Sequence, residues 1–136
     1  MIDFSYTGHE SFPLRISWLP KAVAALEAGI DPFKDPRVGM THLGLGKNMI
    51  QSLAYWVVVT GLAKKTAEGL EITNFAEQTL SRETGKDKFL ENTQTLWLLH
   101  WNLCQGWKEE ERTRQPYAWY YFVNKLTDDE LAPSET

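Results

Sequence analysis

Hydrophobic positions near the start of the chain recur at helical spacing until Gly29 interrupts them. Pro20 falls in the first turn of this stretch, where its missing N–H costs nothing, and Ser17 stands at the capping position. The pattern therefore predicts a helix over roughly 18–28. Its apolar face consists of Leu19, Val23 and Leu26.

Two further helices are predicted on either side of a turn that contains Gly44 and Gly46. Asp35-Pro36 joins a capping side chain to a proline and predicts a short helix over roughly 36–43. After the glycines, apolar side chains resume at helical spacing from Lys47 to Val59, which predicts an amphipathic helix. The polar face of this helix carries Lys47, Asn48, Gln51, Ser52 and Tyr55.

The residues after the amphipathic helix are typical of a small hairpin. Residues 62–73 give a strand, a turn and a second strand, and Thr73 then starts a helix through about Leu80. A short helix, a glycine-containing turn, an amphipathic helix and a hairpin, in that order, are typical of a winged helix-turn-helix. We therefore predict a mainly α-helical fold in which residues 18–81 form a winged helix-turn-helix with a small β-hairpin wing.

The remaining residues are predicted to form an N-terminal arm and additional C-terminal, aromatic-rich helices. Residues 1–17 lack clear periodicity and predict an extended or irregular arm. Asn92 would cap a helix over 93–104 that is apolar nearly all round, which favours a central core helix. Pro116 begins a second, mostly aromatic helix, so that 92–131 is a helical extension. With the arm and extension included, the whole chain, 1–136, is predicted to be a single domain.

Composition supports one packed core in a reducing compartment. The 136 residues are 43% hydrophobic and include six Trp, five Tyr and six Phe, which is enough apolar volume for one domain. A single cysteine excludes an internal disulfide framework and a zinc site made mainly of cysteines. The N-terminus resembles no export signal, and no window reaches the roughly 18 apolar residues of a membrane span. We expect a cytoplasmic protein that does not contact a membrane.

Charge is unevenly distributed along the chain. The formal net charge is -4, yet residues 1–65 hold seven Lys and Arg against five Asp and Glu, and residues 66–136 hold seven against thirteen. Within 34–65, five basic residues accompany Asp35 as the single acid. A locally basic surface attracts anions even on an acidic protein.

The polar face of the amphipathic helix carries side chains suited to DNA. Lys binds phosphate or guanine, Asn and Gln bond adenine, and Ser bonds several bases, while the preceding glycine turn leaves helical N–H groups open to a phosphate. The alternative is an ordinary solvated face, and for Arg37 a surface ion pair with Asp35. The DNA-binding candidates are Lys47, Asn48, Gln51 and Ser52 for bases and Arg37, Lys64 and Lys65 for phosphates.

No catalytic or metal-binding arrangement emerges from the sequence. The run Gly44–Asn48 lacks the second glycine and the Ser or Thr of a phosphate-binding loop. His100 and Cys104 share a helical face but fall short of the three or four ligands of a zinc site. Glu109–Glu111 form a solvated charge run rather than an opposed pair. We therefore expect no enzyme, no metal and no cofactor.

Clustered aromatic side chains allow two interpretations. They could form a platform for unpaired bases, or pack in the core, and core packing is favoured because few basic residues lie among them. If the C-terminal helix were exposed, a large aromatic patch would instead indicate a protein partner. The side chains are Trp97, Trp101, Trp119, Tyr120 and Tyr121.

The run Leu43–Ile50, followed by Tyr55-Trp56, resembles the bacterial family known as domain of unknown function 4007. The resemblance covers nearly the whole chain and implies a prokaryotic phage-defence context beside DNA phosphorothioation genes, without implying a reaction. Ala76 departs from an expected glycine, and family members extend beyond the equivalent of Glu130, so the chain is either a short form or a truncated fragment. Further matching patches are Phe12–Arg15, Trp18–Lys21, Thr95–Trp101, Ala118–Asn124 and Leu126–Leu131.

Together these patterns predict a non-catalytic winged-helix protein that binds double-stranded DNA, plain or modified. It would act as the sensing or targeting component of a defence system and would have protein partners there. The alternative is a protein–protein adaptor in such a complex without direct DNA contact, which the net charge of -4 favours because it opposes non-specific DNA binding.

Overall fold

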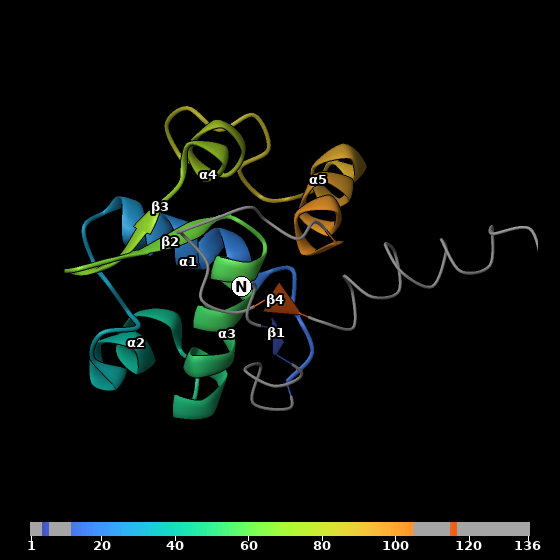
Figure 1. The fold of residues 1–136 in the computed structure, drawn as a ribbon. Coiled ribbons are helices and arrows are strands. Elements are labelled where there is room, and N and C mark those ends of the chain that lie inside the picture. Colours follow the sequence, from blue (N-terminus) through green and yellow to red (C-terminus); the bar gives the residue numbers. More distant parts are fainter. Residues whose placement is uncertain (1–3, 6–11, 105–114, 117–136) are drawn as a thin grey trace, which may run out of the picture.

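Figure 1 shows the fold in a computed structural model, which describes residues 4–5, 12–104 and 115–116. No helix among these residues has the length and apolar character to span a membrane. The helices are α1 (Trp18–Glu27), α2 (Pro36–Leu43), α3 (Lys47–Val59), α4 (Asn74–Thr79) and α5 (Thr93–Cys104). The strands are β1 (Phe4–Ser5), β2 (Ala63–Thr66), β3 (Gly69–Ile72) and β4 (Gln115–Pro116).

Local capping signals set the ends of the helices. The Asp35 side chain accepts a hydrogen bond from the backbone N–H of Arg37 at 2.9 Å and so caps α2. Gly44 then ends α2 with a φ of 66°, a left-handed conformation that favours glycine. Ser17 stands at the N-cap of α1, but its hydroxyl makes no capping hydrogen bond. The helices predicted over 18–28, 36–43, 47–59 and 93–104 are confirmed to within one residue.

The core lies between α1, α3 and the β2–β3 hairpin. The two strands pair antiparallel, with Ala63 opposite Ile72 and Thr66 opposite Gly69, and β3 contacts α1 while β2 contacts α3 (Figure 1). The described part of the chain is thus mainly helical with a two-stranded antiparallel hairpin, an arrangement compatible with a winged helix. Its fully buried hydrophobic side chains include Leu19, Val23, Leu53, Val57, Leu62 and Leu80.

Buried polar bonds gather at the C-terminal end of α3. The Thr60 hydroxyl donates to the carbonyl of Trp56 at 2.6 Å, and the Asn102 side-chain amide donates to the carbonyl of Thr60 at 2.8 Å. The Thr73 hydroxyl donates to the carbonyl of Gly61, which ties the start of α4 to the same turn. This turn therefore joins α3, α4 and α5.

One expectation about the C-terminal end of the chain is corrected. Pro116 lies in β4, which pairs in parallel with β1, rather than starting a helix. The short strand β1 agrees with the prediction of an extended arm. The predicted aromatic helix beyond Pro116 and the glutamate run Glu109–Glu111 lie outside the described residues.

The interpretation of α5 as a central core helix is wrong. Leu99, Asn102 and Leu103 are buried, but Trp97 is 67% exposed and Trp101 is 58% exposed. Only one face of α5 packs on the core, since the buried side chains recur on one side of the helix. The preferred assignment of both tryptophans to the core is therefore wrong as well. Trp119, Tyr120 and Tyr121 lie outside the described residues.

Glycine is required where α2 approaches α3. A Cβ added to Gly39 would overlap the carbonyl oxygen of Pro32 and come within 2.9 Å of the Cδ1 atom of Ile50. Gly39 itself is buried in the middle of α2. A side chain at this position would push α2 away from both neighbours.

We predict that Gly39→Ala lowers the free energy of unfolding by about 1–3 kcal/mol through this overlap. On an open helix the same change would raise it by about 0.5–1 kcal/mol. Urea unfolding followed by circular dichroism measures the difference. Val38→Ala, at the exposed neighbouring position, is the control and should change the free energy by less than about 0.5 kcal/mol. A stabilised Gly39→Ala variant would contradict the close approach.

Glu27 at the end of α1 holds the loop that follows α4. One carboxylate oxygen accepts a hydrogen bond from the Ser81 hydroxyl, and the other accepts one from the backbone N–H of Arg82 at 3.0 Å. The hydrogen bond from Ser81, helped by that from Arg82, lowers the pKa of Glu27 below its ordinary value of 4.5 against the opposing effect of burial. The charged carboxylate therefore stabilises the attachment of the loop.

We predict that Glu27→Gln destabilises the fold at pH 7 more than at pH 3. Because the folded pKa is lowered, the contribution of Glu27 is present above the unfolded pKa and is lost as pH falls through the folded pKa. Urea unfolding of both proteins at the two pH values tests this. Glu71→Gln, exposed on β3, should change the free energy of unfolding by less than about 0.5 kcal/mol at either pH. If the loss of unfolding free energy caused by Glu27→Gln were as large at pH 3 as at pH 7, the charge of Glu27 would not be the cause.

Candidate nucleic-acid interface

The first two turns of α3 present polar side chains to solvent. Lys47, Asn48 and Gln51 are all exposed, whereas Ile50 and Leu53 on the other side of the helix are buried. Successive residues of an α-helix are about 100° apart, so these three side chains share one face. The structure confirms that three of the four predicted base-contacting residues are accessible together.

Ser52 differs from the other three, and the expectation that it is exposed is wrong. Its side chain is 0% exposed, and its hydroxyl has no hydrogen-bond partner within the part of the chain that the structure describes. Trp56, one turn further along the same side, donates from its indole N–H to the carbonyl of Phe12 at 3.3 Å. Phe12 therefore lies beside this side of α3, and Ser52 faces the interior.

The start of α3 lacks a side-chain cap. Gly46 occupies the N-cap position, where it has no side chain to accept a hydrogen bond from the first turn. A Cβ added at Gly46 would meet only the Met49 sulfur, at 3.9 Å, so the space before the helix is open. The N–H groups of the first turn thus face an accessible space beside Lys47.

The predicted phosphate-binding residues are spread over three elements. Arg37 is exposed in the first turn of α2, and its backbone N–H donates a hydrogen bond to the Asp35 carboxylate. On β2, Lys65 is exposed and Lys64 is half-buried. Figure 1 shows the hairpin at the C-terminal end of α3, opposite Lys47, and a helix of 13 residues is about 20 Å long. Lys64 and Lys65 therefore do not form one compact cluster with Lys47.

The acidic balance of the chain does not belong to the described fold. Residues 12–104 contain ten Lys and Arg against nine Asp and Glu, a formal charge of +1. The other residues contain four against nine, a formal charge of -5, and together these give -4. The acidic excess of the chain therefore comes from residues outside 12–104.

His100 and Cys104 lie together on α5. The Cys104 sulfur lies 3.5 Å from Nε2 of His100, and burial raises the pKa of the Cys104 thiol. Across residues 12–104, no three His, Cys, Asp or Glu side chains gather where they could hold a metal ion. Cys104 is therefore poorly suited to act as a thiolate ligand or nucleophile.

Comparison with known proteins identifies the family. A family model described as "Protein of unknown function (DUF4007)" matches residues 6–135. The chain belongs to this family. No curated protein matches the chain.

One similar solved structure is described as "Magnesium ion-bound SspB crystal structure". It is 29% identical in sequence, with a TM-score of 0.70, and the match covers 87% of this chain. The match spans 36% of the SspB chain, so the present chain corresponds to about a third of that protein.

We predict that Ser52→Ala leaves the fold as stable as before or stabilises it by up to about 1 kcal/mol, because a buried hydroxyl without a partner is removed. Thr60→Val is the matched control, since the buried Thr60 hydroxyl donates to Trp56, and it should cost about 1 kcal/mol. Thermal and urea unfolding compare the two variants. A larger loss at Ser52 than at Thr60 would show that the Ser52 hydroxyl has a partner.

Proposed function

We propose that this protein binds double-stranded DNA through the N-terminal turns of α3 and catalyses no reaction on it. The observation that carries the proposal is the joint exposure of Lys47, Asn48 and Gln51 beside an open helix N-terminus. Recognition helices of winged-helix proteins contact base edges from this part of the helix. Ser52 is not among the proposed base contacts, because its side chain is buried.

Each exposed group has a defined chemical role in the proposal. A DNA phosphate is attracted to the N–H groups of the first turn of α3 and to the ammonium group of Lys47. The side-chain amides of Asn48 and Gln51 can each donate to and accept from an adenine in the major groove. Both contacts use one face of α3, which a groove about 12 Å wide admits.

Arg37, Lys64 and Lys65 are proposed as outer phosphate contacts. A duplex that holds the start of α3 in its major groove has backbone on both sides of the helix, so contacts some 20 Å apart belong to one DNA molecule. The hairpin would then act as a wing. Half-burial of Lys64 favours Lys65 as the stronger contact.

The biological setting is proposed from the family and from its resemblance to SspB. The chain would serve as the sensing or targeting component of a prokaryotic phage-defence system linked to DNA phosphorothioation, and would act in the cytoplasm. A fold alone does not define a function, so this setting depends on the DNA-binding experiment below.

A protein–protein adaptor is the second candidate function. The observation that favours it is the exposure of Trp97 and Trp101, one turn apart on α5 beside the half-exposed Leu98. Exposed aromatic side chains of this kind are frequent in protein interfaces. In this alternative α5, and not α3, makes the functional contact.

We predict that Lys47→Gln weakens duplex binding on every sequence and reduces the slope of log affinity against log salt by about one charge. Gln51→Ala should instead change the preference between sequences, by about 1–3 kcal/mol at the base pair it contacts. Fluorescence anisotropy at several salt concentrations, with plain and phosphorothioated versions of the same duplexes, measures both effects.

Lys86→Gln is the matched control for removal of charge, because Lys86 is exposed on the loop before α5 and outside the proposed interface. It should leave the affinity unchanged. If Lys86→Gln and Lys47→Gln lowered the affinity for duplex DNA equally, the binding would depend on overall charge and not on α3. Absence of duplex binding at low salt would exclude the DNA function and leave the adaptor function.

A further inference from the structure

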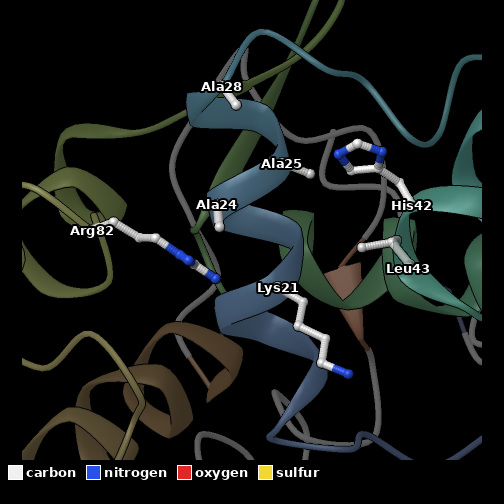
Figure 2. Close-up of a pocket in the computed structure, with 7 residues that line it drawn as sticks. All are labelled: Lys21, Ala24, Ala25, Ala28, His42, Leu43 and Arg82. Carbon is white, nitrogen blue, oxygen red and sulfur yellow. The ribbon is translucent and has the colours of Figure 1, made fainter.

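A pocket of about 480 Å³ lies on the outer face of α1 (Figure 2). Leu19 and Val23 on the inner face of α1 pack in the core, whereas Lys21 and Ala28 on the outer face are exposed. None of the lining residues belongs to α3, and His42 and Leu43 at the end of α2 complete the lining. The pocket is lined by Lys21, Ala24, Ala25, Ala28, His42, Leu43 and Arg82.

The lining combines a small apolar floor with basic side chains. Ala24 and Ala25 of α1, with Ala28 just after the helix, form the floor, and no lining residue is acidic. The basic groups come from three elements, because Lys21 lies on α1, His42 in the last turn of α2, and Arg82 in the loop after α4 (Figure 2). Within the described residues, these three side chains form no hydrogen bond or ion pair with protein.

Glu27 fixes the position of the Arg82 backbone. Its carboxylate holds the Ser81 hydroxyl and the backbone N–H of Arg82, which fixes this residue beside α1. The Arg82 side chain then extends toward the surface of α1 near Ala24 (Figure 2). Glu27 thus holds the backbone of Arg82 from outside the pocket, and its negative charge also attracts the exposed guanidinium group.

We propose that this pocket binds the phosphate group of a small, nucleotide-sized ligand. Arg82 and Lys21 supply two positive charges, which match a dianionic phosphate monoester and exceed what a single carboxylate needs. The pocket volume is far larger than a lone phosphate and falls in the range of small-molecule sites, so the remainder of the ligand covers the alanine floor. His42 can donate an imidazole N–H to that remainder.

This site goes beyond the proposed DNA-binding function and does not depend on it. The residues that line the pocket differ from Lys47, Asn48 and Gln51 on α3, so the two sites can be tested with separate variants. Phosphate chemistry is nevertheless shared with the DNA backbone. The experiment therefore compares inorganic phosphate, AMP and duplex DNA.

Isothermal titration of the intact chain with inorganic phosphate and with AMP tests the site. AMP should bind more tightly than phosphate, and Arg82→Gln should weaken AMP binding about tenfold or more, the loss expected for a charged hydrogen bond. Ala24→Glu, which places a carboxylate on the floor without removing a base, should abolish binding. Lys86→Gln should leave it unchanged, and circular dichroism confirms that each variant is folded.

Duplex titrations with the same variants separate the two sites. Lys47→Gln should weaken duplex binding and leave AMP binding unchanged, and Arg82→Gln should do the reverse. No binding of AMP or phosphate at millimolar concentration would overturn the proposal, as would equal losses at Arg82 and Lys86. If Arg82→Gln weakened duplex binding while AMP failed to bind, the pocket would be a DNA-backbone contact and the small-ligand site would be excluded.

Discussion

The buried C-terminal end of α3 is the constraint on which the rest of the structure depends. The last carbonyl groups of a helix have no partners within the helix and must find them elsewhere when they are buried. Here the Thr60 hydroxyl donates a hydrogen bond to the carbonyl of Trp56, and the Asn102 side-chain amide donates one to the carbonyl of Thr60. The Thr73 hydroxyl donates one to the carbonyl of Gly61. The bonds from Asn102 and Thr73 each bring another element, so that α5 and α4 are placed by the same turn that ends α3.

This arrangement makes the two ends of α3 unequal. The C-terminal end is enclosed, while the N-terminal end begins at Gly46 with an open first turn and an exposed polar face. Gly39 lets α2 lie close against Ile50 without covering that face. The proposed DNA contact therefore uses the end of the helix that tertiary packing leaves free.

The exposed face of α5 and the pocket on α1 differ in how well they specify a ligand. On α5, Trp97 and Trp101 form an exposed apolar surface that fits many partners. On α1, the alanine floor and the basic side chains of Lys21 and Arg82 define both a shape and a charge. The two surfaces lie on different helices, so a protein partner, a small phosphate ligand and DNA need not compete.

Sequence alone determined the helices, the hairpin and most of the proposed DNA face, because their signals are local. Asp35 caps α2 two residues away, Gly44 ends it, and the glycine turn fixes where α3 begins. Whether a side chain within such an element is covered depends on segments far away in the chain. Phe12 is bonded to Trp56 on the side of α3 that carries Ser52, and no helical periodicity predicts that contact.

The exposure of Trp97 and the basic pocket were likewise decided only by tertiary structure. An apolar run such as α5 predicts burial, but a helix that packs on the end of α3 has one covered face, and the sequence does not say which. The pocket joins Lys21, His42 and Arg82, which lie 21 and 40 residues apart along the chain. Arg82 lines the pocket because the Glu27 carboxylate holds the loop after α4 against α1. The two hydrogen bonds that do so link Glu27 to Ser81 and Arg82, which follow it by 54 and 55 positions in the sequence.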